Sequence, residues 1–327
     1  TGLAVVTRAD PMELVFHELP PLLALLSLVG WFGLARVLFG RRDRALFAVG
    51  VQLFLFAATL YSHDGPGNAF FARVAEDKML LWLVTLPVAV RWGLRWLSGG
   101  KRPDGVGYAL ASMATALLHP LGLVLIGIFA GSMVVTRFPF HRSRADVNRF
   151  AWLLIVPLLL LPFTLYEQLN EPFVPYTVEE GTALVDFRLQ LAAGRTLFLP
   201  GGRYLAHPSL LLYPTMLGSL FLSLRLVPRL RSSLAVQYLL GLTFIPLAML
   251  YNPLTAPLLG RIITPWFLWR VTWVIPFGLL LAAGLMPPWQ LPVRRWPWLR
   301  WALPLAVGGL LFLLSLPHLR ASFRLWQ

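Results

Sequence analysis

The sequence contains no cysteine among its 327 residues, and only 13% of the residues are charged. The lack of cysteine excludes disulfides, thiolate nucleophiles, Cys-ligated zinc sites and iron–sulfur clusters. An ordinary soluble domain carries about a quarter charged residues, so the low charge argues against that class. Hydrophobic residues instead make up 57% of the chain. This composition predicts a polytopic membrane protein.

Several catalytic and transport patterns are also missing. The sequence has no Walker A motif, GxSxG motif, dinucleotide fingerprint or kinase signature, and its histidines show no HExxH spacing. No row of Asp, Glu or His runs through the centres of the apolar segments. Ion pumps and proton-coupled transporters need such groups at mid-membrane. Any chemistry is therefore expected at the ends of the membrane segments.

Ten apolar segments are candidates for membrane helices, by comparison with the 17–25 residues that cross a bilayer. They are residues 19–39, 45–61, 79–97, 106–118, 121–136, 151–166, 208–224, 233–250, 270–286 and 300–316. The fourth segment is short, and with the fifth it could form one helix kinked at His119–Pro120. Two separate helices are favoured because the arginine-rich loops then lie on one side of the membrane. The predicted fold is an all-α, polytopic transmembrane protein of about ten spans, a single membrane domain over residues 1–327.

The chain is strongly basic, with 28 Lys and Arg against 14 Asp and Glu, a net charge of +14. In a soluble protein this excess would suggest nucleic acid, but here basic loops at the cytoplasmic face explain it, and no nucleic-acid partner is expected. If the loop Gly40–Arg44 is cytoplasmic, the inner side holds 18 of the 28 basic residues and only Asp43, Asp104 and Asp146 of the acids. The positive-inside rule then predicts both termini on the outer side.

The outer side carries the longer connections. They include an outer stub at residues 1–18, a loop at 62–78, a long outer loop at 167–207 and a loop at 251–270. Such lengths exceed what simple connection requires. The long loop contains a Pro-Gly-Gly-Arg turn ending at Arg203, and it predicts either a substrate-binding region or a docking surface for another subunit. Residues 69–77 are expected to lie in the interface with Phe70 and Phe71 in lipid.

Two outer positions could bind a substrate from a helix end. Lys78 follows Asp77 at the head of the third apolar segment, where charges are costly unless they are paired or hydrated. This pair either marks the membrane edge or contacts a substrate. His119 precedes Pro120, which breaks the helix. One possibility is that its imidazole caps a helix. The other is that the imidazole donates a proton to a phosphate or binds one.

Outer arginines form a further pattern. Arg261 and Arg270 lie in the 251–270 loop, and Arg270 directly follows Trp269. Guanidinium groups beside aromatic rings at headgroup level suit a lipid phosphate. The alternative is that these arginines only anchor the chain at the interface.

Together these features resemble the multi-span glycosyltransferases of the GT-C type, which use polyprenyl-phosphate sugars. The resemblance rests on Asp77-Lys78 before a short segment, the turn Ala116–Pro120 between two short segments, the long outer loops and the arginines beside Trp269. It covers most of the chain. It implies a reaction at the outer face, in which an acid in the first outer loop acts as general base or orients the acceptor. Cationic side chains would hold the departing lipid phosphate.

The resemblance also implies roles for particular residues. The candidate catalytic acids are Asp10, Glu13 and Asp64. The candidate ligands of the lipid phosphate or substrate are Lys78, His119, Arg203, Arg261 and Arg270. The donor would be a polyprenyl-phosphate sugar, and scattered outer carboxylates leave a divalent metal open. In the family the acid lies between the first two spans, and here only residues 8–13 match that loop. Either a catalytic segment precedes Thr1, or catalysis has been lost.

The leading hypothesis is a transferase that takes a sugar from a lipid-phosphate donor at the outer leaflet of a bacterial or archaeal cytoplasmic membrane. Its partners would be membrane lipids and the lipid-linked sugar. The first alternative is a non-catalytic subunit of a larger membrane complex, packed against other membrane subunits. The second is a transporter of a lipid-linked substrate. An enzyme should gather its outer cations and acids, a subunit should scatter them, and a transporter needs a polar path to the inner face.

Overall fold

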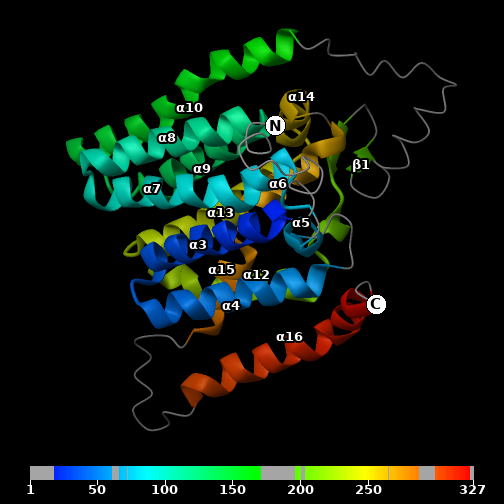
Figure 1. Cartoon of the computed structure of the whole chain (residues 1–327). Coiled ribbons are helices and arrows are strands. Elements are labelled where there is room, and N and C mark those ends of the chain that lie inside the picture. The colour runs from blue at the N-terminus through cyan, green and yellow to red at the C-terminus, as the bar shows by residue number, and fades with distance from the viewer. Residues whose placement is uncertain are drawn as a thin grey trace, which may run out of the picture.

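In the computed structural model the chain is mostly helical, and its long helices lie side by side (Figure 1). The structure describes residues 18–60, 66–71, 73–170, 196–199, 203–263, 265–286 and 299–324. The outer stub before residue 18 and most of the long outer loop lie outside these residues. The first described helix begins, and the last ends, at the same end of the molecule.

The first half of the described chain follows the first six apolar segments. Its helices are α3 (Leu19–Phe39), α4 (Arg42–Thr59), α5 (Pro66–Phe71), α6 (Asp77–Leu80), the π-helical turn η2 (Leu81–Thr85), α7 (Leu86–Gly99), α8 (Arg102–Leu118), α9 (Leu121–Arg137) and α10 (Arg144–Asn170). The elements α6, η2 and α7 form one continuous helix, Asp77–Gly99. A helix therefore occupies each apolar segment that the sequence indicated here.

The second half contains shorter elements. They are β1 (Thr196–Leu199), β2 (Arg203–Ala206), the 3₁₀ turns η3 (Pro208–Leu211) and η4 (Leu224–Arg229), α12 (Pro214–Ser223), α13 (Leu234–Leu250), α14 (Thr255–Ile263), the 3₁₀ helix η5 (Pro265–Val274), α15 (Phe277–Leu285) and α16 (Leu299–Arg324). The strands β1 and β2 pair antiparallel, with Thr196 opposite Ala206. The all-α prediction is corrected to a mostly helical fold with one described hairpin in the long outer loop.

The 251–270 loop and the ninth apolar segment also differ from the prediction. The loop holds α14 and η5 instead of irregular chain, and α13 and α14 meet at an angle of 93°. The segment 270–286 is not one α-helix, because Pro276 separates η5 from α15. Proline lacks the N–H that would continue the helix and clashes with the preceding turn.

The break at His119–Pro120 separates α8 from α9, which pack against each other, so the prediction of two helices here is confirmed. His119 is extended, with φ −166° and ψ 139°, as expected for a residue before proline. The chain can turn this tightly because Gly122 has no Cβ. A Cβ at Gly122 would overlap the carbonyl oxygen of Thr115 and lie 2.7 Å from Cδ1 of Leu81.

The short helix α5 corrects the expectation of an interfacial helix at 69–77. It packs on α4, where the Gly67 N–H donates to Oγ1 of Thr59 at 3.0 Å. The Phe70 ring stacks on Phe56 at 4.7 Å and is only 3% exposed, whereas Phe71 is 39% exposed. Phe70 is therefore a core residue, and only Phe71 remains on the surface.

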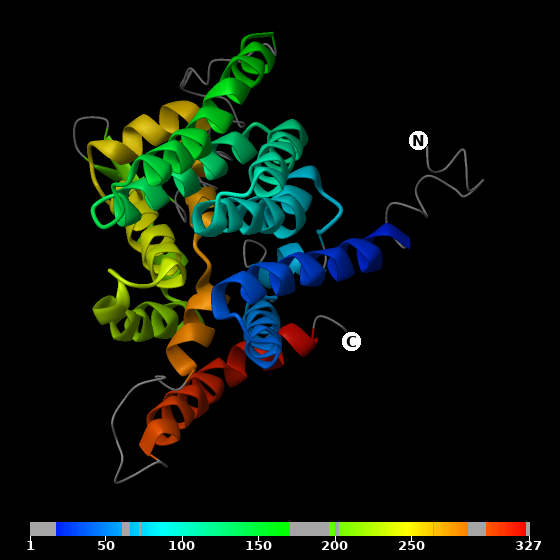
Figure 2. The same cartoon turned by 90° about the vertical axis from the view of Figure 1, so that its left-hand side faces the viewer.

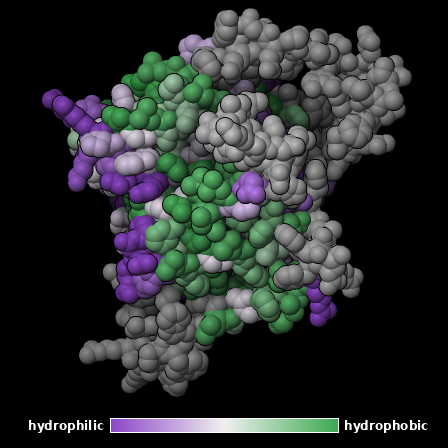
Figure 3. Space-filling view, viewed as in Figure 1, coloured by the Kyte–Doolittle hydropathy of each residue, from purple (hydrophilic) through white to green (hydrophobic). Residues whose placement is uncertain are grey.

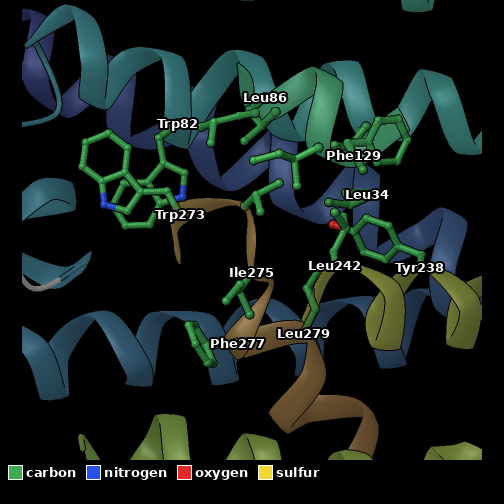
Figure 4. Close-up of a cluster of buried hydrophobic side chains, with 14 of the residues drawn as sticks. Leu34, Trp82, Leu86, Phe129, Tyr238, Leu242, Trp273, Ile275, Phe277 and Leu279 are labelled. Carbon is green, nitrogen blue, oxygen red and sulfur yellow. The ribbon is translucent and has the colours of Figure 1, made fainter. Parts of the chain in front are cut away.

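The core lies between helices that are distant in sequence. Figure 4 shows Leu34 of α3, Trp82 of η2, Phe129 of α9, Tyr238 of α13 and Trp273 of η5 among its side chains. The indole rings of Trp82 and Trp273 stack at 5.0 Å between centroids. Some polar groups in this interior bind backbone carbonyls, as Ser27 Oγ does with Leu83 O at 2.9 Å. Such bonds remove the cost of burying a hydroxyl.

Large apolar side chains also cover the outside of the helices. Leu110 of α8, Leu159 of α10 and Leu313 of α16 are all more than half exposed. They belong to a broad apolar surface, and hydrophilic side chains gather at the end where α3 meets α4 and α7 meets α8 (Figure 3). Exposed apolar area of this extent suits lipid rather than water. In Figure 2, α16 lies at one edge of the molecule, beside α4. Helix α10 lies at the opposite edge.

Four helical segments of the described chain are long and apolar enough to cross a membrane. They are Leu19–Phe39, Asp77–Gly99, Arg144–Pro162 and Phe267–Leu285. The number rises to five if the bent pair α13 and α14 is one span. These helices and the apolar exterior indicate an integral membrane protein. The count of about ten spans stays a prediction.

The turn between α8 and α9 provides a test of this packing. We expect Gly122→Ala to lower the free energy of unfolding by about 1–3 kcal/mol, because the new methyl group overlaps Thr115 and crowds Leu81. Gly127→Ala on the same helix is the matched control, since its Cβ would meet no atom within 4 Å. That variant should be neutral or more stable by up to about 1 kcal/mol. Thermal unfolding in detergent measures both, and equal effects would contradict the close packing of the turn.

Candidate functional site

The described cations that the sequence singled out all lie on elements at one end of the helical bundle. Figure 1 places α5, α6, α14 and β1 at that end. Lys78 belongs to α6, His119 to the α8–α9 turn, Arg203 to β2, Arg261 to α14 and Arg270 to η5. The junctions α3–α4, α7–α8 and η4–α13 lie at the opposite end, which carries most of the described arginines.

Lys78 is paired with Glu76 rather than with Asp77. Its Nζ lies 3.2 Å from Oε2 of Glu76, and Nε of Arg73 lies 2.6 Å from Oε1 of the same carboxylate. Asp77 instead accepts the Lys78 backbone N–H at 2.7 Å. Hydrogen bonds from Arg73 and then Lys78 lower the pKa of Glu76. Glu76 thus holds two cations at the head of the third apolar segment.

His119 caps the start of α9. Its Nδ1 accepts the backbone N–H of Leu121 at 3.0 Å, and the ring is half-buried. With Nδ1 as acceptor, the neutral imidazole carries its proton on Nε2, which is then a donor. The helix-cap role is therefore present in the structure. The hydrogen bond from Leu121 also fixes the orientation of the imidazole ring.

Arg270 lies against aromatic rings on η5. Its guanidinium carbon is 3.7 Å from the centroid of Phe267, 5.8 Å from Trp269 and 5.6 Å from Trp273. The rings of Trp269 and Trp273 meet edge to face at 5.5 Å. A guanidinium over the face of an aromatic ring is attracted by the ring quadrupole and is held in a defined plane. Its position is set by packing rather than by a flexible side chain alone.

Two packing contacts link the elements that carry Lys78, His119 and Arg270. Trp82 lies one helical turn after Lys78 and stacks on Trp273, whose indole also contacts Arg270. The His119 turn reaches the same helix, because Gly122 packs on Leu81. We call Lys78, His119, Arg270, Trp82 and Trp273 the outer cation group.

Arg203 and Arg261 belong to a second group around Tyr204. The Tyr204 hydroxyl donates to the carbonyl oxygen of Pro257 at 3.2 Å, and its ring would overlap a Cβ at Gly260. This contact fixes the hairpin on α14, with Arg203 and Arg261 exposed. Burial raises the pKa of Tyr204, and the nearby charge of Arg261 acts in the opposite direction. The second group adds exposed positive charge beside η5, which contacts both α14 and β2.

Three members of this surface were not singled out as site residues from the sequence. Glu76 has a local signal, because it stands three residues after Arg73 and two before Lys78. Trp82 and Trp273 are separated by almost two hundred residues, and no local pattern indicates that they stack. Only the tertiary packing brings them together.

The candidate catalytic acids Asp10, Glu13 and Asp64 lie outside the described residues. Within the described ranges no group of three or more His, Asp or Glu side chains could hold a metal ion. The described part of this end supplies guanidinium, ammonium and imidazole groups, the carboxylates of Glu76 and Asp77, and the aromatic rings around Arg270. Chemically, this arrangement can bind an anion that carries an apolar group.

Comparisons with protein-family models, with curated proteins and with solved structures find no match to this chain. The case for a function therefore depends on the outer cation group itself.

Proposed function

We propose that this protein is a membrane glycosyltransferase of the GT-C-like kind that uses a lipid-phosphate-linked sugar at the outer leaflet. The observation that carries this proposal is the position of Arg270 among Phe267, Trp269 and Trp273, at the same end of the bundle as Lys78 and His119. To bind a soluble anion, the positive charges would suffice without the aromatic rings. The aromatic rings suit a phosphate that arrives on a lipid.

The charge arrangement supports phosphate binding. A guanidinium presents parallel N–H donors that match the oxygens of a phosphate, and an ammonium adds a mobile point charge. Arg270 is held on its aromatic neighbours, whereas Lys78 shares Glu76 with Arg73. Arg73 and Lys78 are balanced in formal charge by Glu76 and Asp77, so the net positive charge of the group comes from Arg270.

The topology behind the proposal has ten helical segments crossing the bilayer, with the arginine-rich end in the cytoplasm. The outer cation group then faces the outer leaflet of a bacterial or archaeal cytoplasmic membrane. The apolar exterior of the helices gives a polyprenyl chain a continuous surface below the phosphate. The sugar would lie toward the outer loops, where an acceptor can approach.

In the proposed reaction an acceptor hydroxyl attacks the anomeric carbon of the sugar, and the bond from that carbon to the phosphate oxygen breaks. A carboxylate, from Asp10, Glu13 or Asp64, takes the hydroxyl proton as general base. The lipid phosphate leaves with an added negative charge. Arg270, Lys78 and the Nε2 donor of His119 would stabilise that charge, which develops only as the bond breaks.

Removal of the Arg270 charge tests the proposal directly. We expect Arg270→Gln to weaken binding of a polyprenyl phosphate by at least about tenfold, because a hydrogen bond to a charged group is lost. Arg270→Lys should bind with intermediate affinity, since it keeps the charge but loses the planar fork. The measurement is a binding titration on the full chain in nanodiscs.

The control for this titration is Arg42→Gln, which removes an equal charge from an exposed side chain at the opposite end. It should bind the polyprenyl phosphate as the wild type does. If the wild type binds no polyprenyl phosphate, or if both variants weaken it equally, the proposal is wrong. The non-catalytic subunit then becomes the better hypothesis. Binding without sugar transfer to any acceptor, but with lipid movement between leaflets, would favour the transporter.

The Glu76 cluster predicts a pH dependence. The pKa of Glu76 is lowered in the folded protein, so its contribution to stability is complete above the unfolded-state value of about 4.3 and is lost as pH falls through the folded-state value. Thermal unfolding of the wild type should therefore weaken in that acidic range. Glu76→Gln should be less stable at pH 7 and should show a smaller loss on acidification. An unchanged acid profile in Glu76→Gln would contradict the role of this carboxylate.

A further inference from the structure

The end of the molecule opposite the outer cation group contains a cavity of about 340 Å³ between four elements. The end of α3, the turn η4, the start of α13 and the end of α15 line it. This volume falls in the range of small-ligand sites. The cavity lies at the arginine-rich end, which the positive-inside rule places at the inner leaflet.

The cavity has an apolar interior. Leu38, Phe39, Val236, Leu239 and Met286 line it, and each of these side chains is at most 9% exposed to solvent. They come from α3, from α13 and from the residue that follows α15. A free ionic ligand would gain nothing from these walls. An alkyl chain would be removed from solvent against them.

The rim of the same cavity is polar and basic. Arg229, Ser232 and Ser233 line it, and Arg229 is half-buried. The Ser232 hydroxyl donates to the Arg229 carbonyl at 3.4 Å, and Ser233 Oγ accepts the Val236 N–H at 3.4 Å. Within the described ranges the Arg229 guanidinium has no hydrogen bond or ion pair. It is therefore available to an anion at the cavity mouth.

In the described part of the chain no carboxylate forms an ion pair with this rim. The described acids of this end are each engaged elsewhere: Asp43 with Arg41 at 2.8 Å, Asp104 with Arg95 at 2.8 Å and Asp146 with Arg149 at 3.4 Å. None of the cavity-lining residues is acidic. The nearby Arg225 donates to the Gly284 carbonyl at 2.9 Å and so holds the end of α15 against η4. The field at the mouth is positive, and the walls behind it are apolar.

We infer that this cavity binds an anionic phospholipid of the inner leaflet, with the headgroup phosphate at Arg229 and the start of an acyl chain along Phe39, Val236 and Met286. The positive rim matches the phosphate, and the apolar walls match the chain. The apolar walls and the cationic rim are separated along the membrane normal, because the apolar residues lie on the helices and Arg229 lies at their end. This site is independent of the proposed transfer reaction at the other end.

The test uses the full chain in nanodiscs of phosphatidylcholine that contain a photoactivatable phosphatidylglycerol, with a diazirine near the top of one acyl chain. Crosslinked peptides are mapped by mass spectrometry. We expect adducts on the peptides that contain Phe39, Val236 and Met286. A phosphatidylcholine probe with the same diazirine should label them less.

Two variants separate the cavity from the general surface charge. Arg229→Gln removes the rim cation and should reduce phosphatidylglycerol labelling about tenfold. Arg231→Gln is the matched control, because it removes the same charge two residues away from an exposed side chain that does not line the cavity. It should leave labelling within about twofold of the wild type. Equal loss in both variants would show a diffuse attraction to anionic lipid and overturn the inference.

Two further measurements complete the test. Ala235→Phe adds a ring to the cavity wall without changing charge, and it should reduce labelling as Arg229→Gln does. Unchanged labelling in Ala235→Phe would place the lipid elsewhere. Inorganic phosphate at millimolar concentration should not protect the peptides; full protection would mean a soluble anion rather than a lipid. Thermal unfolding of each variant confirms that it is folded, and Ala235→Phe keeps the test decisive if Arg229→Gln does not fold.

Discussion

A bilayer leaves polar side chains only the two ends of a helical bundle, and the organisation of this protein follows from that constraint. An unpaired polar group in hydrocarbon costs several kcal/mol, and several short hydroxyl side chains of the interior bind the backbone. Ser27 donates to Leu83 O, Thr243 to Leu239 O and Thr59 to Leu55 O. Charged side chains collect at the ends instead, where water and headgroups are available. The function must therefore be sought at one end or the other.

Cations at both ends are held by carboxylates and by aromatic rings. At the arginine-rich end, Arg95 pairs with Asp104, whose side chain is 5% exposed, and Arg95 also lies over the Trp92 ring. At the opposite end, Arg270 lies against aromatic rings, and a single carboxylate, Glu76, binds both Arg73 and Lys78. An aromatic face leaves the positive charge of an arginine in place, whereas a carboxylate neutralises it.

The sequence predicts the parts of the fold that local physics decides. Runs of apolar residues mark the helices, and Pro120, Pro214 and Pro276 mark where helices begin or break, because proline removes a donor wherever it occurs. The sequence does not predict contacts between distant segments. Phe70 was expected in lipid but packs on Phe56, and Lys78 was expected beside Asp77 but pairs with Glu76. The Trp82–Trp273 stack, which brings Arg270 to the helix of Lys78, depends on four helices packing correctly and has no local signature.

One segment connects the two ends. Phe267–Leu285 carries Arg270 at its start, contributes Trp273 and Leu279 to the core, and is followed by Met286 in the wall of the inner cavity. Pro276 interrupts its backbone hydrogen bonding at the middle, so packing rather than a continuous helix holds its two halves together. A ligand that binds only the folded arrangement stabilises that arrangement as a whole. Because this segment runs from Arg270 to the wall of the cavity at Arg229, its packing links the two regions.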